Sequence, residues 1–126
     1  MLVLDSGGVS RIAERSTRSL ALIRSLRSAQ LWPPVVPTVV LVECLQGHPA
    51  RDAATNRFLK TCVIDSAVSE GIARRAAQLR RKAGQGSAVD ALVVAFAEPG
   101  GSVLTGDRVD LETLAAHAHN VGVELV

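Results

Sequence analysis

Aromatic residues are scarce in this chain of 126 residues: Trp32, Phe58 and Phe96 are all it has, and tyrosine is absent. Proteins that bind single-stranded nucleic acid commonly stack the bases on exposed aromatic rings. So few rings weaken any interpretation in which bases stack on an aromatic platform. A nucleic acid bound by this chain would be held mainly through its sugar-phosphate backbone.

Cysteines and long apolar runs are also scarce. Cys44 and Cys62 are too few and too scattered for a disulfide framework or a zinc knuckle, so we expect reduced thiols in the core. The N-terminus has no basic segment followed by a long apolar one, and a signal peptide is not expected. No run approaches the roughly 18 uninterrupted apolar residues of a membrane span. These absences predict a soluble protein in a reducing, cytoplasmic setting, with no membrane partner.

Aliphatic residues are what the chain has in abundance. Apolar residues make up 48% of the sequence and charged residues 21%, which is enough apolar material for a core and argues against disorder. A length of 126 residues fits one domain. We therefore expect a single domain that spans residues 1–126.

Short apolar runs alternate with amphipathic segments along the chain. The runs predict strands at residues 1–4, 35–36, 62–64, 102–105 and 122–126. Helices are predicted at residues 9–30 with a second start near 16–17, at 38–46 with Thr38 as the N-cap, and at 50–60, 67–82, 88–97 and 111–118. Such alternation indicates an α/β fold, with a parallel sheet of four to five strands flanked by helices.

The net charge of +2, from 14 basic and 12 acidic residues, says less than the distribution of those charges. Basic residues gather in residues 11–27 and 74–82, whereas several acidic residues stand alone within apolar runs. A basic rim around an acidic centre suits a polyanion held at a cation-bridged site.

Three carboxylates lie where their neighbours indicate burial. Asp5 is the only charged residue among the first ten, Glu43 the only one from 35 to 46, and Asp90 the only one from 87 to 97. A buried, unpaired carboxylate is costly, so three of them in a small chain call for a common cause.

The topology of a parallel sheet supplies that cause. Asp5 ends the first predicted strand, Asp107 follows the strand at 102–105, and Glu43 and Asp90 lie in the first two turns of their helices. In open parallel sheets, ligands bind at the carboxyl ends of the strands, where these four acids would meet. Oxygen donors of this kind suit Mg²⁺ or Mn²⁺, which support phosphodiester hydrolysis. We call Asp5, Glu43, Asp90 and Asp107 the acidic quartet.

Each carboxylate also has a simpler explanation. Asp5 could cap the helix that follows Gly8, Ser87-x-x-Asp90 is a capping-box pattern, and Glu43 could pair with an arginine. We expect Asp110 to be an N-cap and not a ligand, because a predicted helix follows it directly. Caps are commoner than metal ligands one at a time, but four coincidences at one sheet edge favour a metal site.

The motifs that carry the acidic quartet resemble those of the PIN-domain toxins of the VapC type, in order and spacing and nearly from end to end. They are Val3-Leu4-Asp5-Ser6, Pro37-Thr38 followed by Glu43, Val89-Asp90-Ala91-Leu92, and Val103-Leu104-Thr105-Gly106-Asp107. The resemblance implies a Rossmann-like PIN fold, a site-selective RNA endonuclease dependent on Mg²⁺ or Mn²⁺, homodimerisation, and neutralisation by a cognate antitoxin protein.

The resemblance also implies roles for single residues. The acidic quartet would be both catalytic and metal-binding, with Ser6 and Thr105 as supporting hydroxyls. One departure is the Gly7-Gly8 pair, where such toxins often carry another small or hydroxyl residue and then an apolar one. It leaves the packing of the first helical turn open.

Two other classes of protein compete with a nuclease. A non-catalytic PIN-like module would bind RNA or a protein without cutting, although such a relative would be expected to lose some of the four acids. A metal-dependent phosphatase on a similar sheet would show a second aspartate two residues after Asp5, and Gly7 stands there instead.

Overall fold

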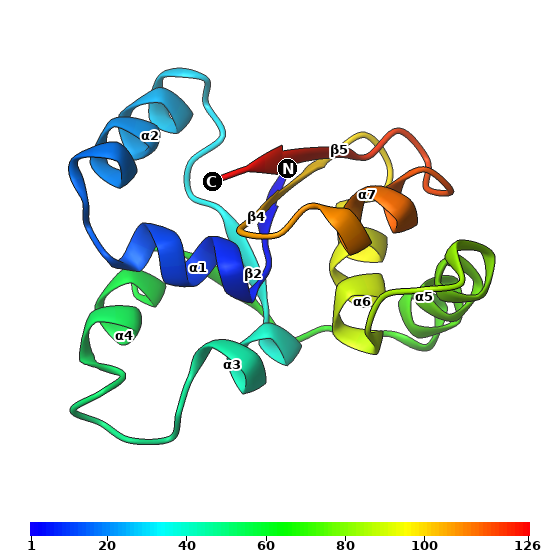
Figure 1. Ribbon diagram of the computed structural model, residues 1–126, viewed down its shortest axis with the longest axis horizontal. Coiled ribbons are helices and arrows are strands. Elements are labelled where there is room, and N and C mark those ends of the chain that lie inside the picture. Colours follow the sequence, from blue (N-terminus) through cyan, green and yellow to red (C-terminus); the bar gives the residue numbers. More distant parts are fainter.

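One sheet of five strands forms the centre of the protein, in a computed structural model that describes residues 1–126 (Figure 1). All neighbouring strands pair in parallel, in the order β3-β2-β1-β4-β5. The predicted α/β class with a parallel sheet is confirmed. In chain order the strands are β1 (Leu2–Leu4), β2 (Val35–Pro37), β3 (Val63–Asp65), β4 (Ser102–Thr105) and β5 (Gly122–Leu125).

The central strands are apolar because both of their faces are covered. Val3 of β1 lies opposite Val35 on one side and Val103 on the other. Val3, Leu4 and Val103 are buried, as expected for strands of a doubly covered parallel sheet. Short uninterrupted apolar runs therefore marked these strands correctly.

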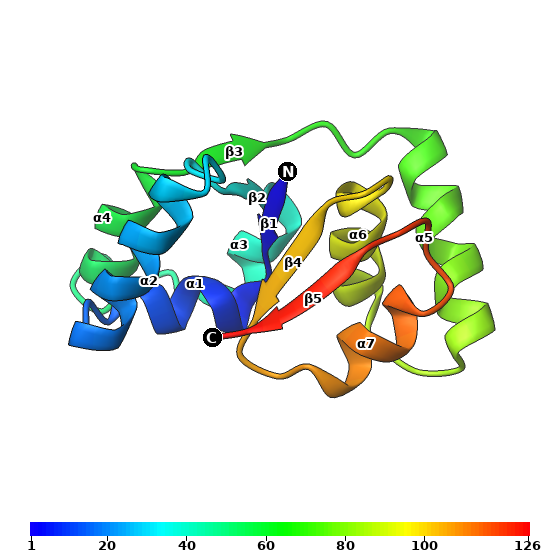
Figure 2. The same cartoon turned by 90° about the horizontal axis from the view of Figure 1, so that it is seen from above.

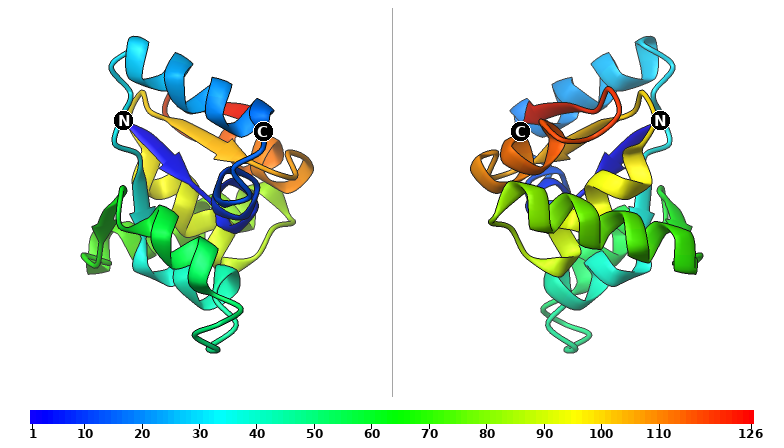
Figure 3. Two further views of the ribbon diagram at one scale, coloured as in Figure 1. Left: turned by 90° about the vertical axis from the view of Figure 1, so that its left-hand side faces the viewer. Right: turned by 90° about the vertical axis from the view of Figure 1, so that its right-hand side faces the viewer.

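Seven helices surround the sheet in two groups (Figures 1 and 2). Helices α1, α2 and α4 pack together on one side and α5, α6 and α7 on the other, while α3 contacts both α1 and α6. Figure 3 shows the two groups from opposite ends of the molecule. None of the helices is both long enough and apolar enough to cross a bilayer. The helices are α1 (Ser6–Ala13), α2 (Thr17–Ser28), α3 (Thr38–Cys44), α4 (Ala53–Leu59), α5 (Glu70–Ala83), α6 (Ala88–Ala97) and α7 (Val109–Ala115).

Several helix boundaries differ from those predicted, and capping explains one of them. The helix predicted at 67–82 begins at Glu70, because the Ser69 hydroxyl accepts a hydrogen bond from the Ile72 N–H, and Val68 lies outside it. Thr38 was predicted as an N-cap, but it is the first residue of α3 and Pro37 holds the cap position without a side-chain bond.

Cys44 and Cys62 are free thiols, as expected, although they are half-buried at the margin of the core and not inside it. Burial raises the pKa of both thiols, and that of Cys62 reaches about 11. Neither thiol is therefore activated as a nucleophile at neutral pH.

The strand order places a topological switch point between β1 and β4. From β1 the chain proceeds outward to β2 and β3, and it then returns to build β4 and β5 on the other side. In sheets of this kind, ligands bind beyond the carboxyl ends of the strands at the switch point. Asp5 and Asp107 follow β1 and β4, so both lie at this edge.

Candidate functional site

An open hollow of about 440 Å³ lies at the switch point. Its walls carry five carboxylates, which belong to Asp5, Glu43, Asp90, Asp107 and Asp110. The fold thus brings the whole acidic quartet to one place, from four different segments of the chain. We call this space the acidic hollow.

Asp5 is the most deeply placed of these acids, with 7% of its surface exposed. Its Oδ1 accepts a 2.7 Å hydrogen bond from the Gly8 N–H, so Asp5 does cap a helix, although α1 already begins at Ser6. Its Oδ2 contacts the Thr105 hydroxyl. Burial raises the pKa of Asp5, the hydrogen bonds from Thr105 and Gly8 lower it, and the Asp90 and Asp107 charges raise it further; the net shift is upward.

The Thr105 hydroxyl links two of the acids. It is fully buried, lies 2.8 Å from the Asp107 carbonyl oxygen, and accepts a 3.0 Å hydrogen bond from the Asp107 N–H. A hydroxyl has one proton, so it cannot donate both to ionised Asp5 and to that carbonyl. The contact with Thr105 lowers the pKa of Asp5, so the hydroxyl proton is donated to the Asp5 Oδ2. Thr105 therefore joins the side chain of Asp5 to the backbone of Asp107 through one buried oxygen.

Asp90 has a structural role and a spare oxygen. The Ser87 Oγ accepts a 3.0 Å bond from the Asp90 N–H, and the Asp90 Oδ2 accepts a 3.2 Å bond from the Ser87 N–H. The capping-box alternative is therefore confirmed at the start of α6. The box uses only one carboxylate oxygen, so a cap and a ligand are compatible at this residue.

Glu43 corrects an expectation, because its side chain is exposed and not buried. Helix α3 lies at the edge of the sheet and buries only Val40, so its apolar residues do not imply that Glu43 is enclosed. The alternative in which Glu43 pairs with an arginine is also wrong, since it forms no ion pair. Partial desolvation, then the Asp90 and Asp5 charges, raise the pKa of Glu43.

The predicted N-cap at Asp110 is also wrong. Helix α7 begins at Val109, so Asp110 lies within its first turn, where its carboxylate accepts no hydrogen bond. Arg108 and Glu112 join across this first turn, through a 2.8 Å hydrogen bond from the Glu112 N–H to the Arg108 carbonyl oxygen and an exposed ion pair. Asp107 accepts a 3.2 Å bond from the Val109 N–H and so holds the cap-like position. Asp110 is thus a fifth carboxylate of the acidic hollow, and it accepts no hydrogen bond.

The Gly7-Gly8 pair has a packing explanation. A Cβ atom on Gly8 would lie 2.3 Å from the Leu104 carbonyl oxygen, and one on Gly7 would lie 2.8 Å from the Gly106 nitrogen. Only glycine permits so close an approach of the first turn of α1 to the end of β4. This contact brings Asp5 against Thr105, and it settles how the first turn packs.

The donors of the acidic hollow suit a hydrated hard cation. No group of three or more histidine, cysteine, aspartate or glutamate side chains is placed so that it could hold a metal ion as it stands. The hollow offers carboxylate and hydroxyl oxygens and neither sulfur nor imidazole. Mg²⁺ is commonly held by one or two carboxylates, with water and substrate phosphate completing its shell. The residues therefore fit a water-rich Mg²⁺ or Mn²⁺ site better than an all-protein cage.

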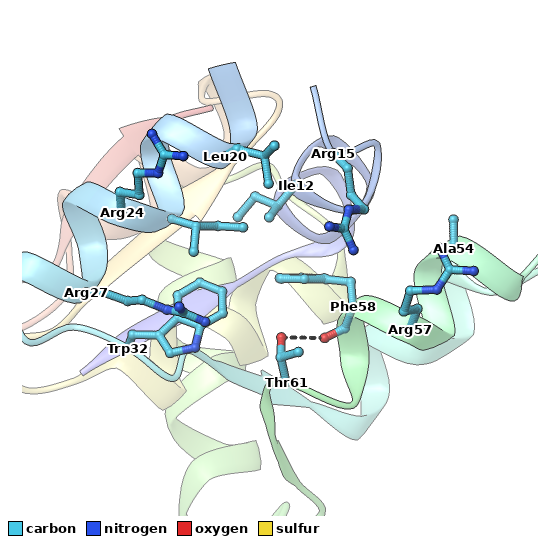
Figure 4. Close-up of a pocket in the computed structure, with 11 residues that line it drawn as sticks. Ile12, Arg15, Leu20, Arg24, Arg27, Trp32, Ala54, Arg57, Phe58 and Thr61 are labelled. Atoms are coloured by element: carbon cyan, nitrogen blue, oxygen red, sulfur yellow. Dashed lines mark hydrogen bonds between the residues drawn. The ribbon is translucent and has the colours of Figure 1, made fainter. Parts of the chain in front are cut away.

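A second hollow, of about 330 Å³, was not anticipated from the sequence (Figure 4). Its floor includes Trp32 and Phe58, whose ring centroids lie 6.2 Å apart, with Ile12 at the back. Residues of α1, α2 and α4 line it, and they are too far apart in the sequence for any local pattern to reveal the cavity. We call it the arginine hollow, after Arg15, Arg24, Arg27 and Arg57, which line it and form no ion pairs.

No protein-family model matches the chain, and no curated protein aligns with it significantly. The five-stranded parallel sheet of order 3-2-1-4-5 is consistent with a PIN-like fold. The case for a function therefore rests on the fold, the motifs and the geometry of the acidic hollow.

Proposed function

We propose that the protein is a metal-dependent endoribonuclease of the PIN-domain kind and the toxin of a toxin–antitoxin pair of the VapC type. The observation that carries the proposal is the gathering of the acidic quartet in one hollow at the switch point of the sheet. Asp5 and Glu43 have raised pKa values there, partly because the acids repel one another. A cluster of mutually repelling carboxylates without basic partners is costly unless a cation joins it.

The carboxylates have different surroundings and so would take different roles. Asp5, Asp90 and Asp107 would hold Mg²⁺ or Mn²⁺, directly or through water. When bound, the cation would lower the pKa of a coordinated water and offset the charge that develops on the scissile phosphate. Glu43 is exposed and unpaired, and its raised pKa suits a group that accepts a proton from the attacking water.

RNA is the proposed substrate because the resemblance to the VapC-type toxins implies it, and the lining of the acidic hollow suits a phosphodiester better than a base. No aromatic side chain lines it, and Leu111 is the one hydrophobic residue among those that do. Contacts to phosphates position a nucleic acid without reading its sequence. Selection of a cleavage site would then come from the shape of the RNA or from contacts outside the hollow.

A non-catalytic PIN-like module that binds RNA or protein is the second candidate. The observation in its favour is that no three side chains form a ready-made metal site. Such a module would bind RNA and leave the length of the RNA unchanged.

The direct test is incubation of the purified protein with total RNA, with Mg²⁺, with Mn²⁺, and with excess chelator, followed by mapping of the cut ends. We expect cleavage at a limited set of sites in the presence of either metal. Intact RNA under all conditions would contradict the proposed nuclease activity. Undiminished cleavage in excess chelator would contradict its dependence on a metal ion.

The arginine hollow is a candidate binding site for the proposed antitoxin. A partner segment with acidic residues around apolar anchors would place its anchors between Leu20 and Phe58 and its carboxylates against the arginines (Figure 4). The Arg27 guanidinium already lies over one face of Trp32, 5.3 Å from the ring centroid, so that face is not free to stack on a base. These features favour a peptide over RNA as the occupant.

The toxin assignment is tested in cells. Expression of the chain alone should arrest bacterial growth, and Asp5→Asn should not. A co-expressed antitoxin should no longer bind the double variant Arg24→Glu with Arg57→Glu. It should still bind Arg74→Glu, because Arg74 lies on α5. Harmless expression in several hosts would contradict the toxin assignment without contradicting the proposed nuclease activity. The proposed homodimer is tested by sedimentation of the purified chain.

A further inference from the structure

One basic residue, Arg11, lines the acidic hollow together with its five carboxylates. It lies in the last turn of α1, and its side chain is exposed. Arg11 is four residues beyond Gly7, so both residues lie on the same face of the helix, at the hollow. No other lysine, arginine or histidine lines this space.

The Arg11 guanidinium is unpaired in spite of its acidic surroundings. An arginine that served only to balance charge would be expected to contact one of the carboxylates. The donors of Arg11 are instead free for an oxyanion from solution, and the guanidinium fork matches a phosphate group. The ion pairs of the protein all lie elsewhere: Arg74–Glu70, Arg75–Glu98, Arg108–Glu112 and His119–Glu98.

The backbone that carries Arg11 is firmly anchored. The Ser19 hydroxyl, on a residue with 5% of its surface exposed, donates a 2.9 Å hydrogen bond to the Arg11 carbonyl oxygen. The next two residues, Ile12 and Ala13, are buried in the core. The Arg11 side chain therefore moves about a fixed Cα, which lowers the entropy lost when it binds a ligand.

Arg11 also lines a neighbouring hollow of about 260 Å³. Arg18 of α2 lines that hollow as well, and so does Val126, at the end of the chain that Figure 2 shows beside α1. Glu14 contributes the only acidic side chain there. Arg11 thus stands between the acidic hollow and a second, more basic one.

We propose that Arg11 binds the RNA phosphate next to the scissile one, and that the strand leaves the acidic hollow across Arg11 toward Arg18. This inference rests on the proposed nuclease function. It assigns a substrate-positioning residue that the acidic quartet does not include, and it specifies the path along which the bound RNA leaves the acidic hollow.

The first test measures how RNA affinity depends on salt. The probe is a single-stranded oligonucleotide that contains a mapped cleavage site, bound with Ca²⁺ in place of Mg²⁺. Loss of one phosphate contact should reduce the slope of log affinity against log salt by about 0.7. We expect that reduction in Arg11→Ala, with a roughly tenfold rise in KM in Mg²⁺ and little change in kcat. Arg11→Lys should keep the slope and lose only part of the affinity.

Two further variants calibrate the result. Arg74→Ala removes an exposed arginine from α5, away from both hollows, and should leave slope and KM unchanged. Arg18→Ala should reduce affinity less than Arg11→Ala does, because Arg18 does not line the acidic hollow and so lies farther from the scissile phosphate.

The second test identifies the phosphate itself. Each linkage near the cleavage site is replaced in turn by an uncharged methylphosphonate. One linkage beside the cut should weaken binding to the wild-type protein, and the same replacement should have no further effect on Arg11→Ala. A wild-type salt slope and KM in Arg11→Ala, or an unchanged methylphosphonate penalty, would overturn the inference. A wild-type protein that neither binds nor cuts RNA would overturn the proposed function itself, which is a distinguishable result.

Discussion

Asp5 and Glu98 are both largely removed from solvent, yet their pKa values shift in opposite directions. Glu98 lies beyond the end of α6, away from the acidic hollow, with 9% of its side chain exposed. Burial raises its pKa, but bonds from the Arg75 guanidinium at 2.8 and 3.0 Å and from the His119 N–H at 3.1 Å lower it more. Asp5 has no basic partner, and its nearest charges are other carboxylates.

The difference between the two sites separates a structural carboxylate from a candidate functional one. Glu98 is paired and ties α6 to α5 and to the segment before β5, so its oxygens have no capacity left for a ligand. The acidic hollow holds carboxylates with unused oxygens, in mutual repulsion. Burial alone does not distinguish a structural carboxylate from a candidate functional one. The number and charge of its hydrogen-bonding partners do.

The largest expected effect is on cleavage, and it should appear at only one of the two sites. Asp5→Asn should reduce the rate of RNA cleavage by at least about 100-fold, because the neutral amide cannot hold the cation. The matched change Glu98→Gln should leave the rate within about twofold of the wild type at a temperature where it is folded. Equal losses in the two variants would show that cleavage reports on folding alone.

Stability should respond in the opposite way. Glu98→Gln replaces charge-assisted hydrogen bonds to Arg75 with weaker ones, and we expect it to lower the free energy of unfolding by about 2 kcal/mol. Asp5→Asn should lower it little or raise it, since the amide removes a buried charge that the neighbouring carboxylates repel. Chemical denaturation of both variants at neutral pH in the absence of metal would measure the contrast.

A smaller contrast exists within the acidic hollow, between Asp107 and Asp110. Asp107→Ala should reduce cleavage and also cost about 1 kcal/mol of stability, because Asp107 accepts the Val109 N–H at the start of α7. Asp110→Ala removes no hydrogen bond, so stability should change by less than about 0.5 kcal/mol. If Asp110 contributes to cation binding, cleavage should still fall roughly tenfold. Full activity in Asp110→Ala would show that Asp110 takes no part in cation binding.

The subtlest effect is on the pH dependence of stability without metal. A pKa raised by folding means that the folded state binds the proton more tightly, so ionisation of Asp5 destabilises the protein as pH rises from about 4. Asp5→Asn lacks this ionisation. The two proteins should be similarly stable at low pH, and the variant should gain relative to the wild type toward neutral pH. Parallel stability curves would contradict the raised pKa of Asp5.

The sequence was sufficient for those parts of the structure that local patterns determine. Apolar runs bounded by turn residues located the strands, and Ser87 marked the start of α6 because its capping box lies within four residues. The four acids could be assigned to one edge, since the direction of each element in a parallel sheet fixes where its ends lie.

Features that depend on distant residues could not be predicted in this way. The exposure of Glu43 follows from the position of α3 at the sheet edge, and its apolar neighbours give no sign of it. Glu98 and Arg75 are 23 residues apart, and no periodicity links them. Helix α7 starts before Asp110 because Asp107 accepts the Val109 N–H, a contact that depends on how the chain turns after β4.

The most direct test of the account is to find where a divalent cation binds. Trace Mn²⁺ broadens the NMR signals of amides close to it, so a titration of the metal-free protein locates even a weakly held ion. We predict that the amides of Ser6, Gly7 and Gly106 lose intensity first, that those near Glu98 do not, and that excess Mg²⁺ restores the signals. Broadening centred on Glu98, or none at the acidic hollow, would contradict the claim that these carboxylates form a metal site.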